Sequence, residues 1–381
     1  MGKRVFIIAG EASGDVHGAN LVKAMAAADP SLSFRGVGGR ELREVGVQLL
    51  WDAAEVAVVG LMEVARHLAT IARAFRLAVN TLRNWHPHLL ILIDYPDFNL
   101  LLARKAKKLG VPVMYYISPQ VWAWRSGRVK TIRRCVDRMV VLFAFEETLY
   151  RKAGVPVSFV GHPCLDTVAG MDRAEPSRRL TPSPGGHPLV GLLPGSRQNE
   201  VRILLPIMLQ AAARLARRMP HAHFVLPLAS TIRADQVRPL LQGRDLQLTV
   251  MEGKTHEAIQ ACEVLVAASG SVTLEAAIFG TPLVVVYKVH RLSYEIGRRL
   301  IRVEHIGLVN LVAGETVAPE LIQDQVTAEG IVKEVMGILE DPGRQAWIRS
   351  RLEEVRRRLG SPGASSRAAE IALSLLGKPK T

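Results

Sequence analysis

The sequence has little of several features that would place it in other protein classes. It has three cysteines in 381 residues, far apart and in no CxxC spacing. This predicts neither a disulfide framework nor a zinc site, and a reducing cytosol is the expected compartment. No apolar run approaches the roughly 18 residues of a membrane-spanning helix. The first apolar run ends at Ala9 and is too short for a signal peptide.

Acidic residues are also scarce, and the resulting positive charge is uneven. The chain has 49 Lys and Arg against 35 Asp and Glu, a formal net charge of +14. From Arg66 to Arg138 there are 14 basic residues and three acids, a local charge of +11. Such a field attracts nucleic acid, phosphorylated substrates or an anionic membrane surface. A solvated basic face that maintains solubility explains the charge equally well, so composition leaves the partner open.

The length and the pattern of apolar runs predict two α/β domains. Short apolar runs alternate with helical stretches, which is typical of a parallel sheet covered by helices on both faces. A Pro-, Gly- and Ser-rich segment, residues 171–187, is a predicted linker, after which the pattern restarts. We expect two Rossmann-like, doubly wound domains, residues 1–170 and 188–360, facing a central crevice. The last helical stretch, within 361–381, packs on the second domain or returns to the first.

The predicted strands are the apolar runs themselves. They are Val5–Ala9, Leu89–Ile93, Val111–Ile117 and Met139–Phe143 in the first domain, and Leu189–Leu193, His223–Leu226, Leu246–Val250, Val264–Ala267 and Leu283–Val286 in the second. Because ligands of such sheets bind beyond the carboxyl ends of the strands, the loops that follow these runs are the places to seek a site.

The first strand runs into a loop of small residues, Ala9 to Asp15, that opens a helix. Small side chains let a ligand approach the backbone, and a helix start offers free N–H donors. Glu11 would repel a phosphate there but suits the hydroxyls of a sugar, and Ser13 adds a hydroxyl. The alternative is tight packing, with Asp15 favourably placed near the positive end of the helix dipole.

Two aspartates follow the buried run Leu89–Ile93. Asp94 is expected at the carboxyl end of the strand, where a general base belongs, and we assign it a catalytic role. Asp97 follows Pro96, and the pattern favours a structural role as the N-cap of a helix over Phe98–Leu109.

Two loops in the second domain favour phosphate. In Leu193–Arg197, Pro194 and Gly195 predict a turn and Ser196 an N-cap, which puts Arg197 in the first helical turn. A cation there opposes the helix dipole, so we assign Arg197 to a diphosphate rather than to helix stability. In the loop after Val264–Ala267, hydroxyls and amides can hold phosphate and a carboxylate can accept both hydroxyls of a ribose. The predicted contacts in these two loops are Gly195, Ser196, Arg197, Ser269, Gly270, Ser271, Thr273 and Glu275.

The amphipathic stretch Leu61–Leu82 has two interpretations. An apolar stripe at helical spacing is usually core, but a stripe beside basic residues also suits a helix lying on a membrane. The stripe is Leu61, Val64, Leu68, Ile71 and Phe75. The helix Arg202–Arg217, with Ile203, Leu204, Leu205, Ile207 and Met208, is a second candidate for lipid contact.

Four motifs together resemble one family. They are Ala9-Gly10-Glu11-Ala12-Ser13-Gly14-Asp15, Ile93-Asp94-Tyr95-Pro96-Asp97-Phe98-Asn99, Ile117-Ser118-Pro119-Gln120-Val121-Trp122-Ala123-Trp124-Arg125 and Leu193-Pro194-Gly195-Ser196-Arg197. They look like the lipid-A-disaccharide synthases, glycosyltransferase family 19. The resemblance extends from about Val5 to Gly314, and the Trp-Ala-Trp-Arg block is its most specific part.

The resemblance implies a GT-B fold and an inverting transfer. UDP-2,3-diacylglucosamine would donate its sugar to the 6-hydroxyl of 2,3-diacylglucosamine 1-phosphate (lipid X), giving the β-1,6 lipid A disaccharide 1-phosphate and UDP. Asp94 matches the proposed base and Arg197 the arginine of the UDP phosphates. Glu11, which we assign to catalysis together with Asp94, and Asn310 match positions expected in the site. Val309 stands where proline is expected. Further contacts with substrate are expected from Ser13, Asp97, Asn99, Trp124 and Arg125.

No cofactor and no metal are expected, because members of this fold stabilise the leaving diphosphate with helix dipoles and basic side chains. The sequence has no DxD motif, in keeping with that expectation. Since both substrates carry acyl chains, the resemblance also implies a peripheral enzyme on the cytoplasmic face of the inner membrane. It leaves the oligomeric state open, a homodimer included.

Three other functions are compatible with part of the sequence. A lipid II N-acetylglucosaminyltransferase shares the fold, but its N-terminal glycine-rich pattern is absent. A sugar-nucleotide 2-epimerase of the same architecture leaves the Trp122–Arg125 block unexplained. A non-enzymatic anion- or RNA-binding protein explains the charge but not Asp94 and Glu11 at strand ends.

Overall fold

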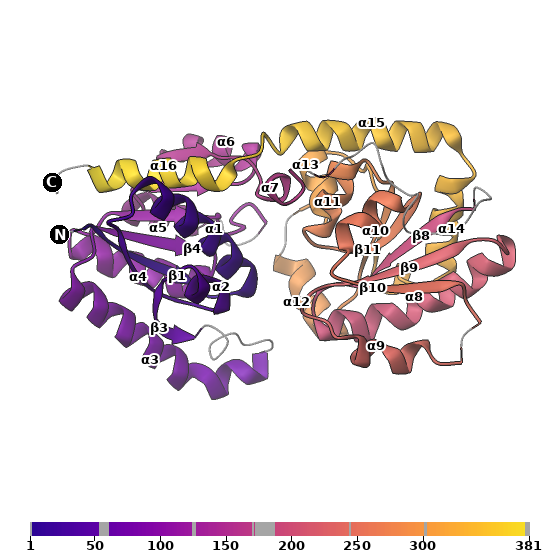
Figure 1. Ribbon diagram of the computed structural model, residues 1–381, viewed down its shortest axis with the longest axis horizontal. Helices are drawn as coiled ribbons and strands as arrows, with labels where there is room; N and C mark the ends of the chain where they lie inside the picture. The colour runs from indigo at the N-terminus through magenta and orange to yellow at the C-terminus, as the bar shows by residue number, and fades with distance from the viewer. Residues whose placement is uncertain are drawn as a thin grey trace. The chain divides into compact units, whose positions relative to one another are not determined.

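The computed structural model describes residues 2–52, 61–123, 127–169, 171, 187–243, 245–300 and 303–377. The chain divides into two compact units, Met1–Asp166 with Gly360–Thr381, and Thr167–Leu359. We call them unit 1 and unit 2. Apart from Met171 and His187, the predicted linker lies outside the described residues. The chain therefore leaves unit 1 once and returns to it for its last helix (Figure 1).

Unit 1 contains a seven-stranded parallel sheet in the order β3-β2-β1-β4-β5-β6-β7. On β1, Val5 and Ile7 enter one hydrophobic core, whereas Phe6 and Ile8 enter the other. Burial on both faces explains why the run is continuously apolar rather than alternating. The strands are β1 (Arg4–Ala9), β2 (Ser33–Gly38), β3 (Gln48–Asp52), β4 (Leu89–Ile93), β5 (Val113–Tyr116), β6 (Arg138–Val141) and β7 (Val157–Phe159).

Helices cover both faces of this sheet. Residues of α3, α4, α5 and α6 line one core, and residues of α1, α2 and α16 line the other. The C-terminal α16 lies beside α1 (yellow and indigo in Figure 1), so the end of the chain completes the fold of its beginning. The helices are α1 (Ala12–Ala28), α2 (Arg40–Glu44), α3 (Leu61–Trp85), α4 (Pro96–Lys108), α5 (Arg128–Cys135), α6 (Ala144–Lys152), α7 (Cys164–Thr167, across the boundary) and α16 (Ala364–Gly377).

Unit 2 contains a six-stranded parallel sheet in the order β10-β9-β8-β11-β12-β13. The strands are β8 (Leu189–Leu193), β9 (His223–Leu228), β10 (Leu248–Glu252), β11 (Val264–Ala268), β12 (Leu283–Tyr287) and β13 (Glu320–Ile322). The helices are α8 (Gln198–Arg218), α9 (Ala234–Leu241), α10 (Thr255–Ala261), α11 (Val272–Phe279), α12 (Arg291–Leu300), α13 (Leu308–Ala313), α14 (Ala328–Leu339) and α15 (Pro342–Arg358), with the short 3₁₀ helix η2 (Gln323–Gln325).

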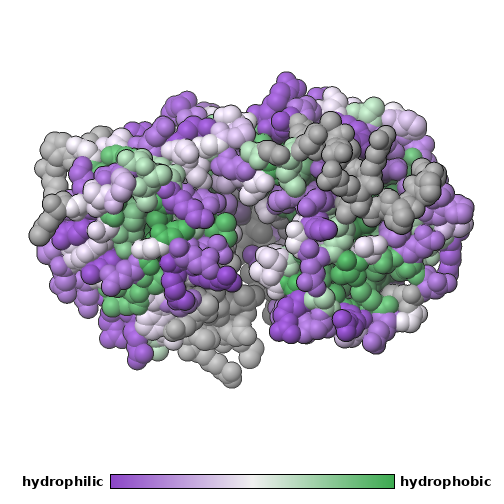
Figure 2. Space-filling view, viewed as in Figure 1, coloured by the Kyte–Doolittle hydropathy of each residue, from purple (hydrophilic) through white to green (hydrophobic). Residues whose placement is uncertain are grey.

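Every predicted strand is present, with ends that differ by up to two residues. Four strands were missed, namely β2, β3, β7 and β13. They are short or polar segments away from the centre of each sheet, where one apolar face or a few residues are enough for pairing. In Figure 2 the hydrophobic surface gathers in the middle of each unit and hydrophilic groups surround it.

The described part of the amphipathic stripe on α3 belongs to the core. Ile71 and Phe75 pack against the buried cluster of unit 1, while the side chains of Leu61, Val64 and Leu68 lie outside the described residues. The second candidate for lipid contact was wrong at its centre, because Leu204, Leu205 and Met208 of α8 are buried. None of the helices in the described ranges is long and apolar enough to cross a membrane.

Candidate active site

The loops predicted to carry chemistry in unit 1 meet where the strand order reverses. β1 and β4 pair in parallel, with Ala9 opposite Ile93, and consecutive strands run outward from this pair in both directions. The two loops that follow them carry Glu11 and Asp94. Such a switch point is where open α/β sheets bind their ligands.

The backbone at Asp94 is held in an uncommon conformation. Asp94 and Tyr95 have φ angles of +43° and +44°, a left-handed region that costs non-glycine residues of order 1–3 kcal/mol each. The Asp94 carbonyl accepts hydrogen bonds from the Tyr115 hydroxyl and, at 2.7 Å, from Nδ2 of Asn99. A side chain at Gly10 would lie 2.5 Å from the Tyr95 ring. Glycine is therefore required where the two loops touch.

Burial and a neighbouring charge tune the Asp94 carboxyl. Its pKa is raised to about 6, first by burial and then by the negative charge of Glu11, against a smaller opposing effect of the Tyr95 N–H. Glu11 itself is exposed at the start of α1. A carboxylate with a pKa just below neutrality is ionised at pH 7 and still basic enough to take a proton, which is the requirement for a general base.

The structure places Ser13, Asn99 and Asp97 differently from one another. Ser13 is exposed in the first turn of α1. Asn99 is fully buried, and its amide nitrogen donates to the carbonyls of Ile93 and Asp94, so its side chain supports the strained turn. Its contact with substrate stays a prediction. The predicted N-cap role of Asp97 was wrong, because α4 starts at Pro96 with Tyr95 as its N-cap. The exposed Asp97 carboxylate pairs with Arg128 instead.

The loop after β5 is anchored to α6 by a buried polar network. The Ser118 and Tyr150 hydroxyls lie 2.8 Å apart, and the Trp122 indole donates to Oε1 of Glu146 at 3.1 Å. Burial raises the pKa of the Glu146 carboxyl to about 7. The anchored loop leads directly to Trp124 and Arg125, which lie outside the described residues.

Unit 2 repeats the arrangement with different chemistry. β8 and β11 pair in parallel, with Leu193 opposite Ala267, and the strand order reverses at this pair. The two loops predicted to bind phosphate follow these two strands. They therefore lie at the switch point of the second sheet, as the loops of Glu11 and Asp94 do in the first.

The turn after β8 is organised around Glu200. Its Oε2 accepts the N–H groups of Ser196 and Arg197, each at 3.2 Å, and its Oε1 pairs with the Arg197 guanidinium at 2.9 Å. Gly195, with a φ of +113°, leaves the space that this carboxylate occupies. The predicted capping was wrong: Arg197, not Ser196, precedes the first turn of α8. The ion pair with Glu200 therefore offsets the unfavourable position of Arg197 at the start of the helix.

The loop after β11 mixes buried and exposed groups. The Ser269 hydroxyl donates to the Ile306 carbonyl, and the buried Thr273 hydroxyl donates to the Gly270 carbonyl. Ser271 is exposed at the N-cap of α11 and makes no capping bond with its side chain. Glu275 pairs through Oε2 with Nε2 of His256 at 3.1 Å.

Asn310 is buried, and its side chain forms hydrogen bonds with other residues of unit 2. Its amide nitrogen donates to the Ala318 carbonyl and to Glu320, and its oxygen accepts the N–H groups of Val317 and Ala318. No donor or acceptor is left over, so its predicted contact with substrate is not supported.

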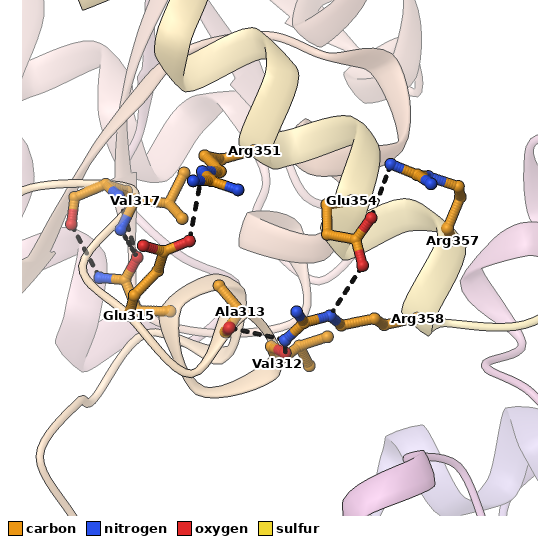
Figure 3. Close-up of polar contacts among 10 residues, drawn as sticks. Val312, Ala313, Glu315, Val317, Arg351, Glu354, Arg357 and Arg358 are labelled. Carbon is orange, nitrogen blue, oxygen red and sulfur yellow. Dashed lines mark hydrogen bonds and ion pairs between the residues drawn. The ribbon is translucent and has the colours of Figure 1, made fainter.

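The same segment is tied to α15 (Figure 3). Arg358 donates to the carbonyls of Val312 and Ala313, and Arg351 pairs with Glu315. The loop that Asn310 holds is therefore fixed from both sides.

A surface cleft of about 470 Å³ lies in unit 2 at the carboxyl ends of β9 and β10. The hydroxyl of Thr231, within the cleft loop, donates to the Ser196 carbonyl, which joins this cleft to the turn of Arg197. Its lining residues are Leu228, Ala229, Ser230, Ile232, Arg233, Ala234, Asp235, Glu252 and Gly253. Within the described residues no group of three His, Cys, Asp or Glu side chains is placed to hold a metal ion.

Solved structures define the fold class. The calicheamicin glycosyltransferase CalG4 superposes with a TM-score of 0.65 at 16% identity, covering 100% of both chains. A UDP-N-acetylglucosamine 2-epimerase from Neisseria meningitidis gives 0.62 at 12% identity, covering 97% of this chain and 100% of that one. The two parallel, doubly wound units form a GT-B fold. Because transferases and epimerases share it, the fold does not separate these activities.

Sequence relatives decide between them. Residues 5–375 match the family model described as lipid-A-disaccharide synthetase. The lipid-A-disaccharide synthase of Geobacter sulfurreducens is 51% identical over 378 residues, with 98% of each chain covered, and that of Coxiella burnetii is 41% identical over 375 residues, with 98% and 99% covered. The chain belongs to the lipid-A-disaccharide synthetase family and is a glycosyltransferase. The 2-epimerase alternative is not favoured.

Four residues of the site escaped the sequence argument: Tyr115, Glu146, Glu200 and His256. Tyr115 and Glu146 lie in a strand and a helix, where a tyrosine or a glutamate is unremarkable. A signal existed for Glu200, because a glutamate three residues after an N-cap often accepts the N-cap N–H. None existed for His256, whose partner is 19 residues further along the chain and comes near through packing of α10 on α11.

Proposed function

We propose that the protein transfers 2,3-diacylglucosamine from UDP-2,3-diacylglucosamine to the 6-hydroxyl of 2,3-diacylglucosamine 1-phosphate, releasing UDP. The observation that carries the proposal is Asp94, a partly buried carboxylate held by a strained turn at the switch point of unit 1. The name of the family says which disaccharide is made, and the geometry suggests how.

In this proposal unit 1 activates the acceptor. The Asp94 carboxylate takes the proton of the 6-hydroxyl while that oxygen forms a bond to C1 of the donor sugar. The bond from C1 to the diphosphate oxygen breaks, UDP leaves with the electron pair of that bond, and the configuration at C1 inverts. Burial and, to a smaller extent, the charge of Glu11 keep the Asp94 pKa high enough for the transfer. Glu11 is exposed and accepts hydrogen bonds from sugar hydroxyls.

In the same proposal unit 2 binds the donor. The leaving diphosphate gains negative charge, which the Arg197 guanidinium and the N–H groups at the starts of α8 and α11 stabilise. Of these groups, the N–H groups of Ser196 and Arg197 at the start of α8 bond Glu200. The diphosphate therefore either displaces the Glu200 carboxylate or binds the Arg197 guanidinium together with it. The cleft beside Thr231 is the proposed binding site of the nucleoside.

We also propose that the protein contacts the cytoplasmic face of the inner membrane from unit 1. On α4, Leu101 is 51% exposed and Leu109 at its end 44% exposed, among exposed lysines. The neighbouring α5 adds the exposed cations Lys130, Arg133 and Arg134. Apolar side chains among cations suit an anionic lipid surface. Co-sedimentation with anionic vesicles should fall in a K130E/R133E/R134E variant and remain in a variant with three charges reversed on α15.

The reaction is tested with the purified protein, UDP-2,3-diacylglucosamine and the acylated monosaccharide 1-phosphate. We expect UDP release that requires the acceptor, together with a β-1,6 disaccharide identified by mass spectrometry and NMR. UDP release at the same rate without acceptor, or none with it, would refute the proposed reaction.

A further inference from the structure

The ion pair of His256 and Glu275 joins two helices of unit 2 and includes a predicted contact with the donor. Five of the ion pairs among the described residues of unit 2 join residues three or four apart in the sequence. His256 and Glu275 come from different helices, α10 and α11, and their side chains are 28% and 18% exposed. Glu275 is also the carboxylate expected to accept the ribose hydroxyls of the donor.

Two contacts hold the imidazole of His256. Its Nε2 lies 3.1 Å from Oε2 of Glu275, and the ring meets that of Phe279 at a centroid distance of 6.0 Å. Phe279 ends α11, one turn beyond Glu275. The hydrogen bond to the carboxylate raises the pKa of His256 against the opposing effect of burial, which favours the protonated imidazole.

The chain around His256 links this pair to the cleft. Glu252 and Gly253 line the cleft and precede Lys254, the N-cap of α10, whose second residue is His256. The bond to His256 uses Oε2 of Glu275, and no described residue bonds Oε1. His256 thus holds Oε2 of Glu275, while Oε1 can accept a hydrogen bond from a nucleoside bound in the cleft.

From this geometry we infer that His256 is a positioning residue that holds Glu275 for recognition of the ribose of the donor nucleotide. The inference rests on the proposed function, since it assigns the nucleotide to unit 2. A carboxylate with one oxygen fixed loses less conformational freedom when it accepts the hydroxyls of a ribose. His256 therefore makes the protein select a ribonucleotide over a deoxyribonucleotide without touching either.

The test compares UDP with 2′-deoxy-UDP and 3′-deoxy-UDP by calorimetric titration of the full chain. We expect the wild type to bind UDP about tenfold more tightly than at least one of the deoxy nucleotides, as for a lost hydrogen bond to a charged group. H256A should lower this preference to about twofold by weakening UDP and leaving the deoxy nucleotide nearly unchanged. E275Q should lower it as much, and H256A/E275Q no further, because both act through one carboxylate.

Glu257 supplies the matched control. It follows His256 on α10 and its charge also acts on the imidazole, but it makes no bond to it. E257Q should keep the full preference. If H256A weakens UDP and the deoxy nucleotides by the same factor, His256 only maintains the fold of the site and the inference fails. A wild type that does not distinguish the nucleotides also overturns it.

Failure of the inference and failure of the proposed function are separable. If the protein shows no ribose selectivity, the inference fails, but acceptor-dependent UDP release can still be measured and still tests the proposed reaction. A protein that selects ribose but produces no disaccharide retains the inference and refutes the reaction.

Discussion

The two switch points have the same topology but opposite physical character. In unit 1 the loop after β4 is strained and partly buried, with positive φ angles at Asp94 and Tyr95 and a carboxyl whose pKa is raised to about 6. In unit 2 the loop after β8 is exposed, and its glycine takes the one positive φ angle of the turn. Strain and burial are useful where a proton must move, whereas exposed donors are enough where an anion must be held.

The largest expected effect is on catalysis in unit 1. Asp94→Asn removes the base and keeps the shape of the side chain, so the rate of transfer should fall by about 10²–10⁴-fold. The affinity for UDP, measured by titration, should remain within about twofold because binding is assigned to unit 2. Asp29→Asn is the control, since this carboxylate of unit 1 follows the last residue of α1 and bonds Ser31. A similar loss of rate in both variants would contradict the division between the two units.

The second effect is on the pH dependence of stability and tests the burial of the Glu146 carboxyl in unit 1. The pKa of Glu146 in the folded protein, about 7, is above its ordinary value of 4.5. Its contribution to stability is therefore complete below about pH 4.5 and is lost as the pH rises through 7, by at most about 3 kcal/mol. Glu146→Gln should flatten this part of the pH dependence, measured by urea denaturation from pH 5 to 9. An unchanged slope would show that Glu146 is ionised in the folded protein.

A smaller effect is expected from the exposed turn of unit 2. Arg197→Ala should weaken UDP about tenfold, as expected for one exposed, charge-assisted contact. Arg202→Ala, which removes an exposed arginine from the next turn of α8, should leave the affinity unchanged. Equal affinity of wild type and Arg197→Ala would mean that Arg197 serves only Glu200 and that the diphosphate binds elsewhere.

The smallest effect concerns the coupling of Glu11 and Asp94. If Asp94 must be ionised, kcat/KM should rise with pH up to about 6 and then level off. Glu11→Gln removes a like charge, so the Asp94 pKa should fall and the bend of the profile should move to lower pH by less than one unit. Glu41→Gln, on the exposed surface of α2, should leave the bend in place. A bend that moves to higher pH would exclude repulsion between the two carboxylates.

Sequence patterns located the central strands and the loops after them because burial on two faces leaves a strong local signal. Continuous apolar runs such as Leu89–Ile93 matched their strands at both ends. Edge strands such as β3 and β13 carry no such run. The prediction of the first residue of α4 was wrong by a few residues, because the helix begins at Pro96, before the expected cap Asp97. The roles of buried amides were also missed, since Asn99 and Asn310 satisfy backbone groups several residues away.

What the sequence determined by itself is the set of strand ends that carry Glu11, Asp94, Arg197 and Glu275, together with the family to which these motifs belong. Local order along the chain is enough for that, because each loop directly follows its strand. Only the tertiary structure brought β1 beside β4 and β8 beside β11, and so paired the loops in space. It alone also supplied the partners that alter these residues: Tyr115 for Asp94, Glu200 for Arg197 and His256 for Glu275. Strand order and helix packing depend on contacts between distant segments, which no local pattern records.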